Sequence, residues 1–119
     1  MDAAQALADL TELSAQIERA AVVDADGGVL ASTFADDERA RRFAEGARRL
    51  AEEAETARTS RGLSGVAQLE AATLGGSVFV VQDGRRLIAA TTRPEPTVGL
   101  VFYDLKHCLR AIGDGDAAA

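Results

Sequence analysis

Apolar residues near the start of the chain recur every three or four positions, which is the spacing of one face of an α-helix. The recurring positions are Ala6, Leu7, Leu10, Leu13 and Ile17. Polar and acidic residues occupy most of the other positions in this stretch, so we predict a first helix with one buried face.

A longer helical pattern runs from about Asp36 to Arg58. Its apolar stripe consists of Ala40, Phe43, Ala47, Leu50 and Ala54. Glu38 stands four residues before Arg42, an order of charges that stabilises an isolated helix by a few tenths of a kcal/mol. We therefore predict a second, long helix with a charged outer face.

The stretch from Ala20 to Ser32 has two apolar runs on either side of the segment Asp24 to Gly28. Asp and Gly tolerate the positive φ angles of tight turns, so the stretch is typical of a β-hairpin. It also resembles a strand followed by Asp-x-Asp-Gly, the nucleophile motif of the haloacid-dehalogenase-type phosphatases. The first interpretation suggests a small binding domain, and the second suggests an enzyme.

Three further strands are predicted in the second half of the chain. Gln68 to Leu74 alternates apolar and polar residues, whereas Ser77 to Gln82 and Leu87 to Thr92 are apolar on both faces. Turn residues at Gly75-Gly76 and Asp83-Gly84 separate them. Strands that are apolar on both faces need cover on both sides, so we expect helices above and below the sheet.

A third helix is predicted after the proline-containing segment Arg93 to Pro96, which ends the sheet. Thr97 is placed to cap its first turn, and Gly113 is placed to end it. Its apolar face consists of Val98, Val101, Leu105, Cys108, Leu109 and Ile112. Residues 1–113 are expected to form a single domain, and residues 114–119 a flexible tail.

The predicted order α-β-β-α-β-β-β-α indicates an α+β fold, an α/β/α sandwich built on an antiparallel sheet. At ~1.5 Å per residue the second helix would be roughly 35 Å long, whereas a sheet of five strands at ~4.8 Å each is only about 24 Å wide. The second helix is therefore expected to extend beyond the sheet that it covers.

Composition restricts the classes of partner. The chain has 119 residues and a formal net charge of −6, which argues against nucleic acid because binding it requires a basic surface. The single cysteine, Cys108, excludes an internal disulfide and fits a reducing compartment. The start of the chain does not look like a signal peptide, and no run approaches the roughly 20 apolar residues that span a bilayer. We expect a cytoplasmic protein that does not bind membranes.

Phosphatase chemistry lacks its other residues downstream of Asp24. It needs a later Ser or Thr, a phosphate-neutralising Lys or Arg, and an acidic pair for magnesium. It also needs parallel strands, which are joined by crossovers of a dozen or more residues, but the next predicted strand begins about five residues after Asp24. The lone Lys106 lies in the last predicted helix. The hairpin interpretation is therefore preferred.

Other patterns for catalysis or cofactor binding are missing as well. The hairpin turn lacks the third acidic position and the later Glu of an EF-hand loop, and the sequence has no Gly-x-x-x-x-Gly-Lys loop. His107 and Cys108 have no second His or Cys to complete a zinc site, and no motif supplies a nucleophile for His107. We expect no enzymatic activity, no metal and no cofactor.

The strand from Gln68 to Leu74 contains neither Pro nor Lys, which usually protect an exposed sheet edge. At an edge, it could satisfy its free backbone groups by pairing with its copy in a second chain, and the end of the long helix would pack on the same partner. We predict a C₂ homodimer. The predicted interface residues are Phe43, Ala47, Leu50, Gln68, Leu69, Glu70, Ala71 and Ala72.

The charged face of the second helix has two interpretations. It is either a solvated face held by pairs within the helix, or a docking surface for a partner protein. Its residues are Arg41, Arg42, Glu45, Arg48, Arg49 and Glu52.

Over about residues 3 to 112 the chain resembles the Roadblock family, the dynein-light-chain-type domains. Ala21 to Ser32 is similar to the family's first strand, Asp-x-x-Gly turn and second strand. Val98 to Leu105 resembles the Gly-Leu-hydrophobic start of its final helix. This resemblance makes Asp24, Gly27 and Gly28 structural turn residues.

The resemblance implies a profilin/longin-like fold whose five-stranded sheet has the order 2-1-5-4-3, with the second helix on one face and the terminal helices on the other. It also implies a dimer joined through the third strands and second helices. Members of the family bind and regulate small Ras-like GTPases, sometimes as activators of GTP hydrolysis. The expected function is a non-enzymatic homodimeric regulator of such a GTPase, contacted through the Arg-rich face of the second helix.

Two alternative functions are left open by the sequence. A dimeric scaffold without effect on nucleotide turnover would share every feature above. A small-ligand sensor is the other alternative, because related sandwiches hold ligands between sheet and helix. The small apolar residues of the predicted strands indicate a filled core, which ranks the sensor last.

Overall fold

The computed structural model describes residues 1–63, 65, 67–84 and 86–117. In chain order its elements are α1 (Ala3–Leu13), β1 (Ile17–Val23), β2 (Val29–Ser32), α2 (Asp37–Thr59), β3 (Gln68–Thr73), β4 (Gly76–Asp83), β5 (Arg86–Thr92) and α3 (Val98–Ala117). The predicted order of helices and strands is confirmed.

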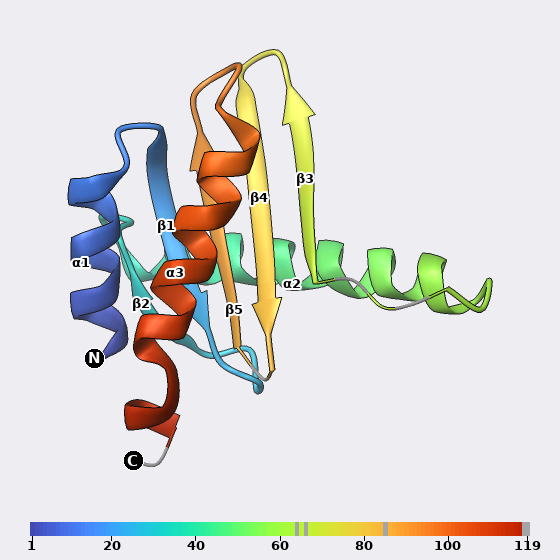
Figure 1. The fold of residues 1–119 in the computed structure, drawn as a ribbon, viewed down its shortest axis with the longest axis horizontal. Helices are drawn as coiled ribbons and strands as arrows, with labels where there is room; N and C mark the ends of the chain where they lie inside the picture. The colour runs from blue at the N-terminus through green and yellow to red at the C-terminus, as the bar shows by residue number, and fades with distance from the viewer. Residues whose placement is uncertain (64, 66, 85, 118–119) are drawn as a thin grey trace.

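The strands form one sheet in the order β2-β1-β5-β4-β3, and every neighbouring pair is antiparallel. The helices α1 and α3 lie on one face, and α2 crosses the other face at a steep angle to the strands (Figure 1). The α+β sandwich and its strand order are thus as predicted, and β3 and β2 are the two edges of the sheet.

The turn between β1 and β2 is organised by Asp24. Its Oδ1 accepts hydrogen bonds from the backbone N–H of Asp26 at 2.9 Å and of Gly28 at 3.0 Å. Gly27 has a φ of 89°, which glycine adopts without steric cost. Because β1 and β2 pair directly through this turn, the segment is a hairpin, and the Asp24 carboxylate holds the turn together.

The first helix ends earlier than its apolar pattern predicts. Ser14 follows it in an extended conformation, with φ −115° and ψ 109°. Ile17 then opens β1, so its assignment to the first helix is wrong. Leu13 is 75% exposed at the end of α1. The chain turns between Leu13 and Ile17, so their four-residue spacing does not place the two side chains on one helical face.

The last helix begins at Val98, where the Thr97 carbonyl accepts the Val101 amide at 3.0 Å. Gly113, with φ 26° and ψ −137°, interrupts the helical backbone, which resumes beyond it and reaches Ala117. The predicted stop at Gly113 therefore ends the regular helix. Residues 114–117, assigned above to a tail, have helical backbone, whereas residues 118 and 119 lie outside the described residues.

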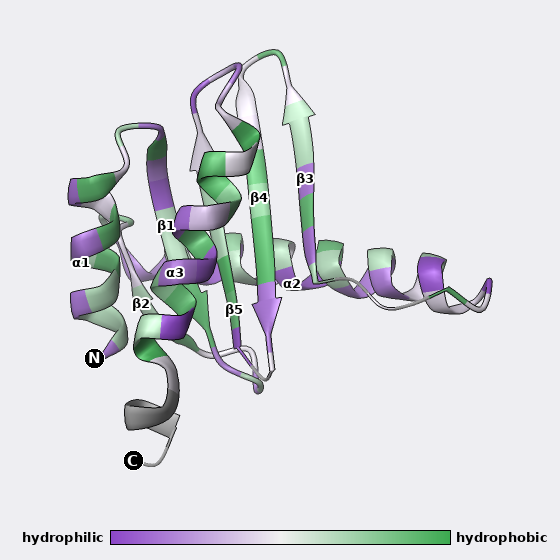
Figure 2. Ribbon diagram, viewed as in Figure 1, coloured by the Kyte–Doolittle hydropathy of each residue, from purple (hydrophilic) through white to green (hydrophobic). Residues whose placement is uncertain are grey.

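Two apolar cores fill the sandwich, one on each face of the sheet. The core under α1 and α3 contains large side chains such as Phe79, Ile88, Leu105 and Ile112. The core under α2 is smaller, and every buried residue that α2 contributes to the fold is an alanine. Figure 2 shows apolar residues along β4 and β5 and at intervals along α3.

The buried stripe of α2 is rotated from the predicted one. The buried residues are Ala40, Ala44, Ala47 and Ala51. Phe43 is only half-buried and Leu50 is 36% exposed, although both are in the predicted stripe. Alanine allows the helix axis to approach the sheet closely, and the two larger residues then lie on its flank.

Candidate functional site

The outer edge of β3 presents unpaired backbone groups. The Ala67 carbonyl accepts the Gln82 amide of β4 at 2.8 Å, and residues in an antiparallel strand alternate in the edge toward which they hydrogen bond. The N–H and C=O groups of Gln68, Glu70 and Ala72 therefore point away from β4. With β3 at the end of the sheet, this row is available to another strand.

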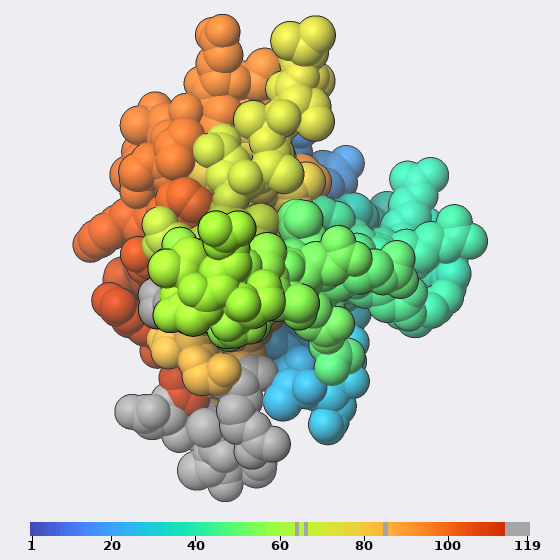
Figure 3. All heavy atoms as spheres, turned by 90° about the vertical axis from the view of Figure 1, so that its right-hand side faces the viewer, coloured from blue at the N-terminus to red at the C-terminus, as the bar shows by residue number. Residues whose placement is uncertain are grey.

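The helix α2 extends past this edge. It is a 23-residue helix that crosses the sheet and continues well beyond β3 (Figure 1). Seen from that side, its last turns stand in front of the strands (Figure 3). The predicted overhang is present, and the strand edge and the projecting helix form one continuous surface.

One flank of α2 is made of apolar and small residues that follow each other at three- and four-residue spacing. These residues, which we call the α2 flank, are Phe43, Gly46, Leu50, Ala54 and Ala57. No atom lies within 4 Å of the place where a Cβ on Gly46 would stand, so this point of the helix is open to close approach.

The α2 flank borders a part of the sheet that α2 leaves uncovered. Leu69 and Val78 lie half-buried at the margin of the core under α2, and Ala71 pairs directly with Val78. The opposite side of α2 carries Arg48, which reaches the β1–β2 turn, so the α2 flank faces toward the β3–β4 turn. This margin and the α2 flank form an open apolar corner.

The predicted interface residues divide into three groups. Phe43, Leu50, Leu69 and Ala71 line the open corner. Gln68, Glu70 and Ala72 are exposed and project to the other face of the sheet, because they alternate with the corner residues along β3. Ala47 is 4% exposed and packs against the sheet in its own chain, which removes it from the accessible surface.

The charged face of α2 is a network of ion pairs. The Arg41 guanidinium lies 2.6 Å from a Glu38 carboxylate oxygen and 2.8 Å from one of Glu45, and Arg42 lies 3.2 Å from Glu38. The hydrogen bonds that Arg41 donates to the Glu38 carboxylate, followed by the negative charges of Glu38 and Glu45, raise the pKa of Arg41. All of these side chains are more than half exposed, so water screens each pair and the charges remain accessible at the surface.

Arg48 and Arg49 differ in what they contact. Arg48 lies 3.4 Å from Glu52 and 3.5 Å from the carbonyl oxygen of Asp26, and its guanidinium sits over Gly27. It therefore links α2 to the β1–β2 turn. Arg49 is exposed on the outer side of the helix, where an approaching protein can reach it.

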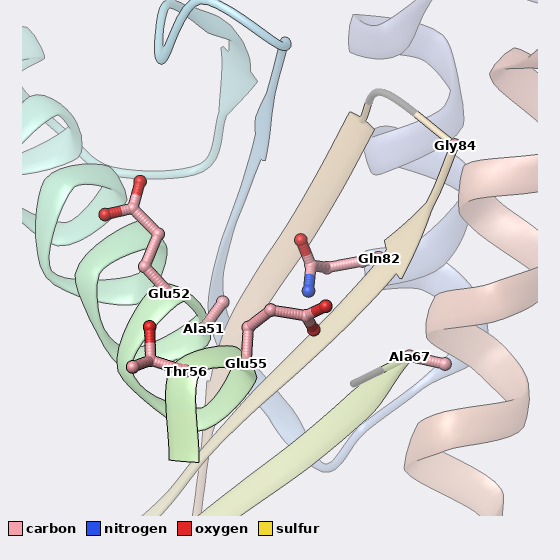
Figure 4. A pocket seen from close by; sticks show the side chains of 7 residues that line it. All are labelled: Ala51, Glu52, Glu55, Thr56, Ala67, Gln82 and Gly84. Carbon is pink, nitrogen blue, oxygen red and sulfur yellow. The ribbon is translucent and has the colours of Figure 1, made fainter. Parts of the chain in front are cut away.

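A hollow opens where α2 leaves the sheet (Figure 4). It has a volume of about 630 Å³, and its lining residues are Ala51, Glu52, Glu55, Thr56, Ala67, Gln82 and Gly84. The Glu55 and Gln82 side chains point toward each other across it (Figure 4). Neither residue was predicted from the sequence, because only the structure shows that Ala51 is buried and that Glu55, four residues later, lies where α2 leaves the sheet.

Two further properties of the described residues concern metal-binding clusters and membrane-spanning helices. Within the described residues, no group of three or more His, Cys, Asp and Glu side chains is arranged to hold a metal ion. No helix in that part of the chain is both long enough and apolar enough to cross a membrane.

The model of the Roadblock/LC7 domain family matches residues 3–92. The chain belongs to the Roadblock/LC7 family. The match ends at the last residue of β5, so α3 follows the matched part of this Roadblock chain. No curated protein matches the sequence.

Solved structures share the Roadblock fold at low sequence identity. A Roadblock/LC7 domain from Streptomyces avermitilis superposes with a TM-score of 0.85 at 18% identity, covering 94% of this chain and 95% of that one. The gliding protein MglB from Thermus thermophilus gives 0.77 at 15% identity, covering 92% and 84%. LokiProfilin2, from a complex with rabbit actin, gives 0.58 at 14% identity, covering 91% and 93%. These likenesses show a common fold, which extends to profilins.

Proposed function

We propose that this Roadblock protein is a homodimer that binds and regulates a small Ras-like GTPase. The observation that carries the proposal is the open edge of β3 beside the open apolar corner, in a chain of the Roadblock/LC7 family. In this proposal the chain acts by contact, and the groups that hydrolyse GTP belong to the GTPase.

The two parts of the dimer surface support the same symmetric arrangement. Two copies of β3 related by a twofold axis run antiparallel. The outward backbone N–H and C=O groups of Gln68, Glu70 and Ala72 in one chain can then hydrogen bond to the outward groups of β3 in the other. The axis then brings the α2 flanks of the two chains toward each other. Gly46 and Ala54 permit close approach of two helices, and Leu50 supplies apolar area.

Assembly of chains with this fold is supported by a neighbour. A structure described as MglB with tetrameric arrangement superposes with a TM-score of 0.75 at 17% identity. Binding of a GTPase is the function that the resemblance to the Roadblock family implies, and the exposed arginines of α2 are the proposed contact.

Light scattering tests the dimer. At micromolar concentration we expect twice the chain mass of 12.4 kDa. Leu50→Arg places a charge in the apolar corner and should give a monomer, whereas Leu30→Arg at the β2 edge, where Leu30 is 44% exposed, should leave the dimer intact. A monomeric wild-type protein would refute the dimer.

Co-purification from the native host, followed by GTP hydrolysis assays, tests the partner. We expect a small GTPase to be retained and its hydrolysis rate to change when this protein is added. Reversing Arg42 and Arg49 to Glu should weaken binding, with Arg110→Glu on the exposed side of α3 as the control. Retention without a change in rate would favour a scaffold, and failure to retain any GTPase would overturn the proposal.

A further inference from the structure

A second apolar surface lies between α1 and α3, on the face of the sheet opposite α2. The two helices enclose a hollow of about 100 Å³, which has Ala6, Leu10 and Cys108 among its lining residues. Cys108 is only 4% exposed, so it forms part of the buried floor of the hollow. The space accepts an apolar side chain inserted between the helices.

Large apolar side chains surround this hollow and project into solvent. Leu13, which lines it, is 75% exposed, and Met1, at its other end, is 51% exposed. On α3, Tyr103 is 65% exposed, and its ring stacks on His107, which also lines the hollow. Leu100 is 50% exposed and precedes the lining residue Asp104 by one helical turn. Apolar groups of this size, gathered around one groove, are typical of a protein interaction site.

The rim of the groove is acidic. Asp9 of α1 and Asp104 of α3 line it from opposite sides, and neither carboxylate has an ion-pair partner within the described residues. The first 18 residues contain four acidic residues and no Lys, Arg or His. Lys106 and Arg110 of α3 are not among the lining residues. The surface around the groove therefore favours a positively charged partner.

The groove stays accessible in the proposed dimer. The layer of α1 and α3 covers the face opposite α2, and α1 lies toward the β2 side of the sheet, away from β3 (Figure 1). A twofold axis at the β3 edge would place two copies of the groove on one face of the combined sheet. The groove is therefore independent of the surface used for dimerisation.

We infer that the groove between α1 and α3 binds an amphipathic helix of a partner protein, one whose apolar stripe is flanked by Lys or Arg. Two neighbouring helices with a groove between them accept a third helix along that groove, and the apolar stripe supplies the side chain that enters the hollow. Asp9 and Asp104 then pair with the basic residues on either side of the stripe. The same acidic rim disfavours an anionic membrane or a nucleic acid as the occupant.

A labelled peptide tests this inference. The probe is an 18-residue amidated helix with Leu every three or four positions, Lys beside the Leu stripe and Ala elsewhere, measured by fluorescence anisotropy. One control peptide replaces every Lys by Glu, and another scrambles the sequence so that no stripe forms. We expect the Lys peptide to bind and both control peptides to bind at least tenfold more weakly.

Protein variants locate the bound peptide. The double variant Asp9→Asn and Asp104→Asn should weaken binding by roughly 3- to 30-fold, because each exposed ion pair contributes up to about 1 kcal/mol. Tyr103→Ala should weaken it as well. The pair Asp37→Asn and Glu53→Gln, at exposed positions of α2, changes the net charge equally and should leave binding unchanged. Circular dichroism melts establish that each variant is folded.

Three results would overturn the inference. The first is equal binding of the scrambled peptide, and the second is an equal loss of affinity in the α2 control pair. The third is unchanged affinity in the Asp9 and Asp104 variant. Because the dimer is measured separately by light scattering, a failure here leaves the proposed dimer unaffected.

Discussion

The two helical layers that cover the sheet differ in the size of the side chains that they bury. Under α1 and α3 lie Phe79, Leu105 and Ile112, with Phe79 and Phe102 in an edge-to-face contact at 4.9 Å. Under α2 the helix contributes only alanines. Burial of apolar area contributes about 25 cal/mol per Å², so the layer with the larger buried side chains contributes more hydrophobic stabilisation than the other.

This difference in side-chain size means that the residues of α2 that hold it to the sheet are not the ones that the proposed dimer would use. The alanines of α2 bring the helix close to the sheet, and its larger apolar residues, Phe43 and Leu50, lie on the flank instead of in the core. A helix of this kind is held to the sheet by small side chains, while its larger apolar side chains stay partly exposed, as the proposed dimer requires. The molecule has one layer that specifies the fold and another that is suited to binding a second chain.

The largest effect is expected in the α1/α3 core. Phe79→Ala should lower the free energy of unfolding by about 3–5 kcal/mol, because the ring is fully buried and its removal leaves a cavity. Phe43→Ala, which removes a half-buried ring on α2, should cost clearly less in a dilute solution. Chemical denaturation at several protein concentrations measures both. Equal losses for the two variants would show that the layers do not differ in this way.

Overpacking beneath α2 should have a smaller effect. Ala47→Leu inserts a large side chain where the helix lies closest to the sheet and should destabilise by about 1–3 kcal/mol. Ala8→Leu, at an exposed position of α1, makes the same chemical change and should stay within about 0.5 kcal/mol of wild type. Thermal melts check the pair, and tolerance of Ala47→Leu would contradict a close helix–sheet contact.

A substitution at Gly46 is expected to change the stability of the chain and the affinity of the dimer in opposite directions. Gly46→Ala should stabilise the isolated chain by up to about 1 kcal/mol through helix propensity, because the new methyl group meets no atom of its own chain. The same methyl group stands on the α2 flank and should raise the dissociation constant of the dimer. Analytical ultracentrifugation gives that constant, and an unchanged value would place Gly46 away from the helix crossing.

The smallest effect concerns Cys108 in the α1/α3 layer. Burial, followed by the charge of Asp9, raises the pKa of its thiol from 9.0 to about 11. The folded state thus holds this proton more tightly than the unfolded state, and the stabilisation present below pH 9.0 is lost as pH rises toward about 11. At pH 9.5 the loss should be below about 1 kcal/mol. Cys108→Ala should remove this part of the pH dependence, as measured by denaturation from pH 8 to 10.

The hairpin could be predicted from the sequence because its signals are local. Asp24 and Gly27 favour a turn whatever the rest of the fold, and the apolar runs beside them favour strands. The strand order followed from the resemblance to the Roadblock family. The edge position of β3 followed from the same strand order, whereas the absence of Pro and Lys from Gln68 to Leu74 indicated only that such an edge would be unprotected.

The rotation of α2 and the end of α1 could not be predicted with the same success. Helical periodicity gives weight to large apolar residues, so it selected Phe43 and Leu50 although the sheet accepts only alanines there. It also joined Ile17 to the first helix, because Leu13 and Ile17 are four residues apart in the sequence. Both outcomes depend on how closely a helix approaches the sheet and where the chain turns, which are tertiary properties.

The short strand β2 has a consequence for the proposed dimer. It has four residues, fewer than any other strand of the described sheet, and it forms the edge opposite β3. In a β3-paired dimer both ends of the combined sheet are therefore β2 strands, which offer few backbone groups for a further chain. In the proposed dimer, addition of further strands would therefore stop at two chains, and the short β2 edge would keep the combined sheet from growing into a fibre.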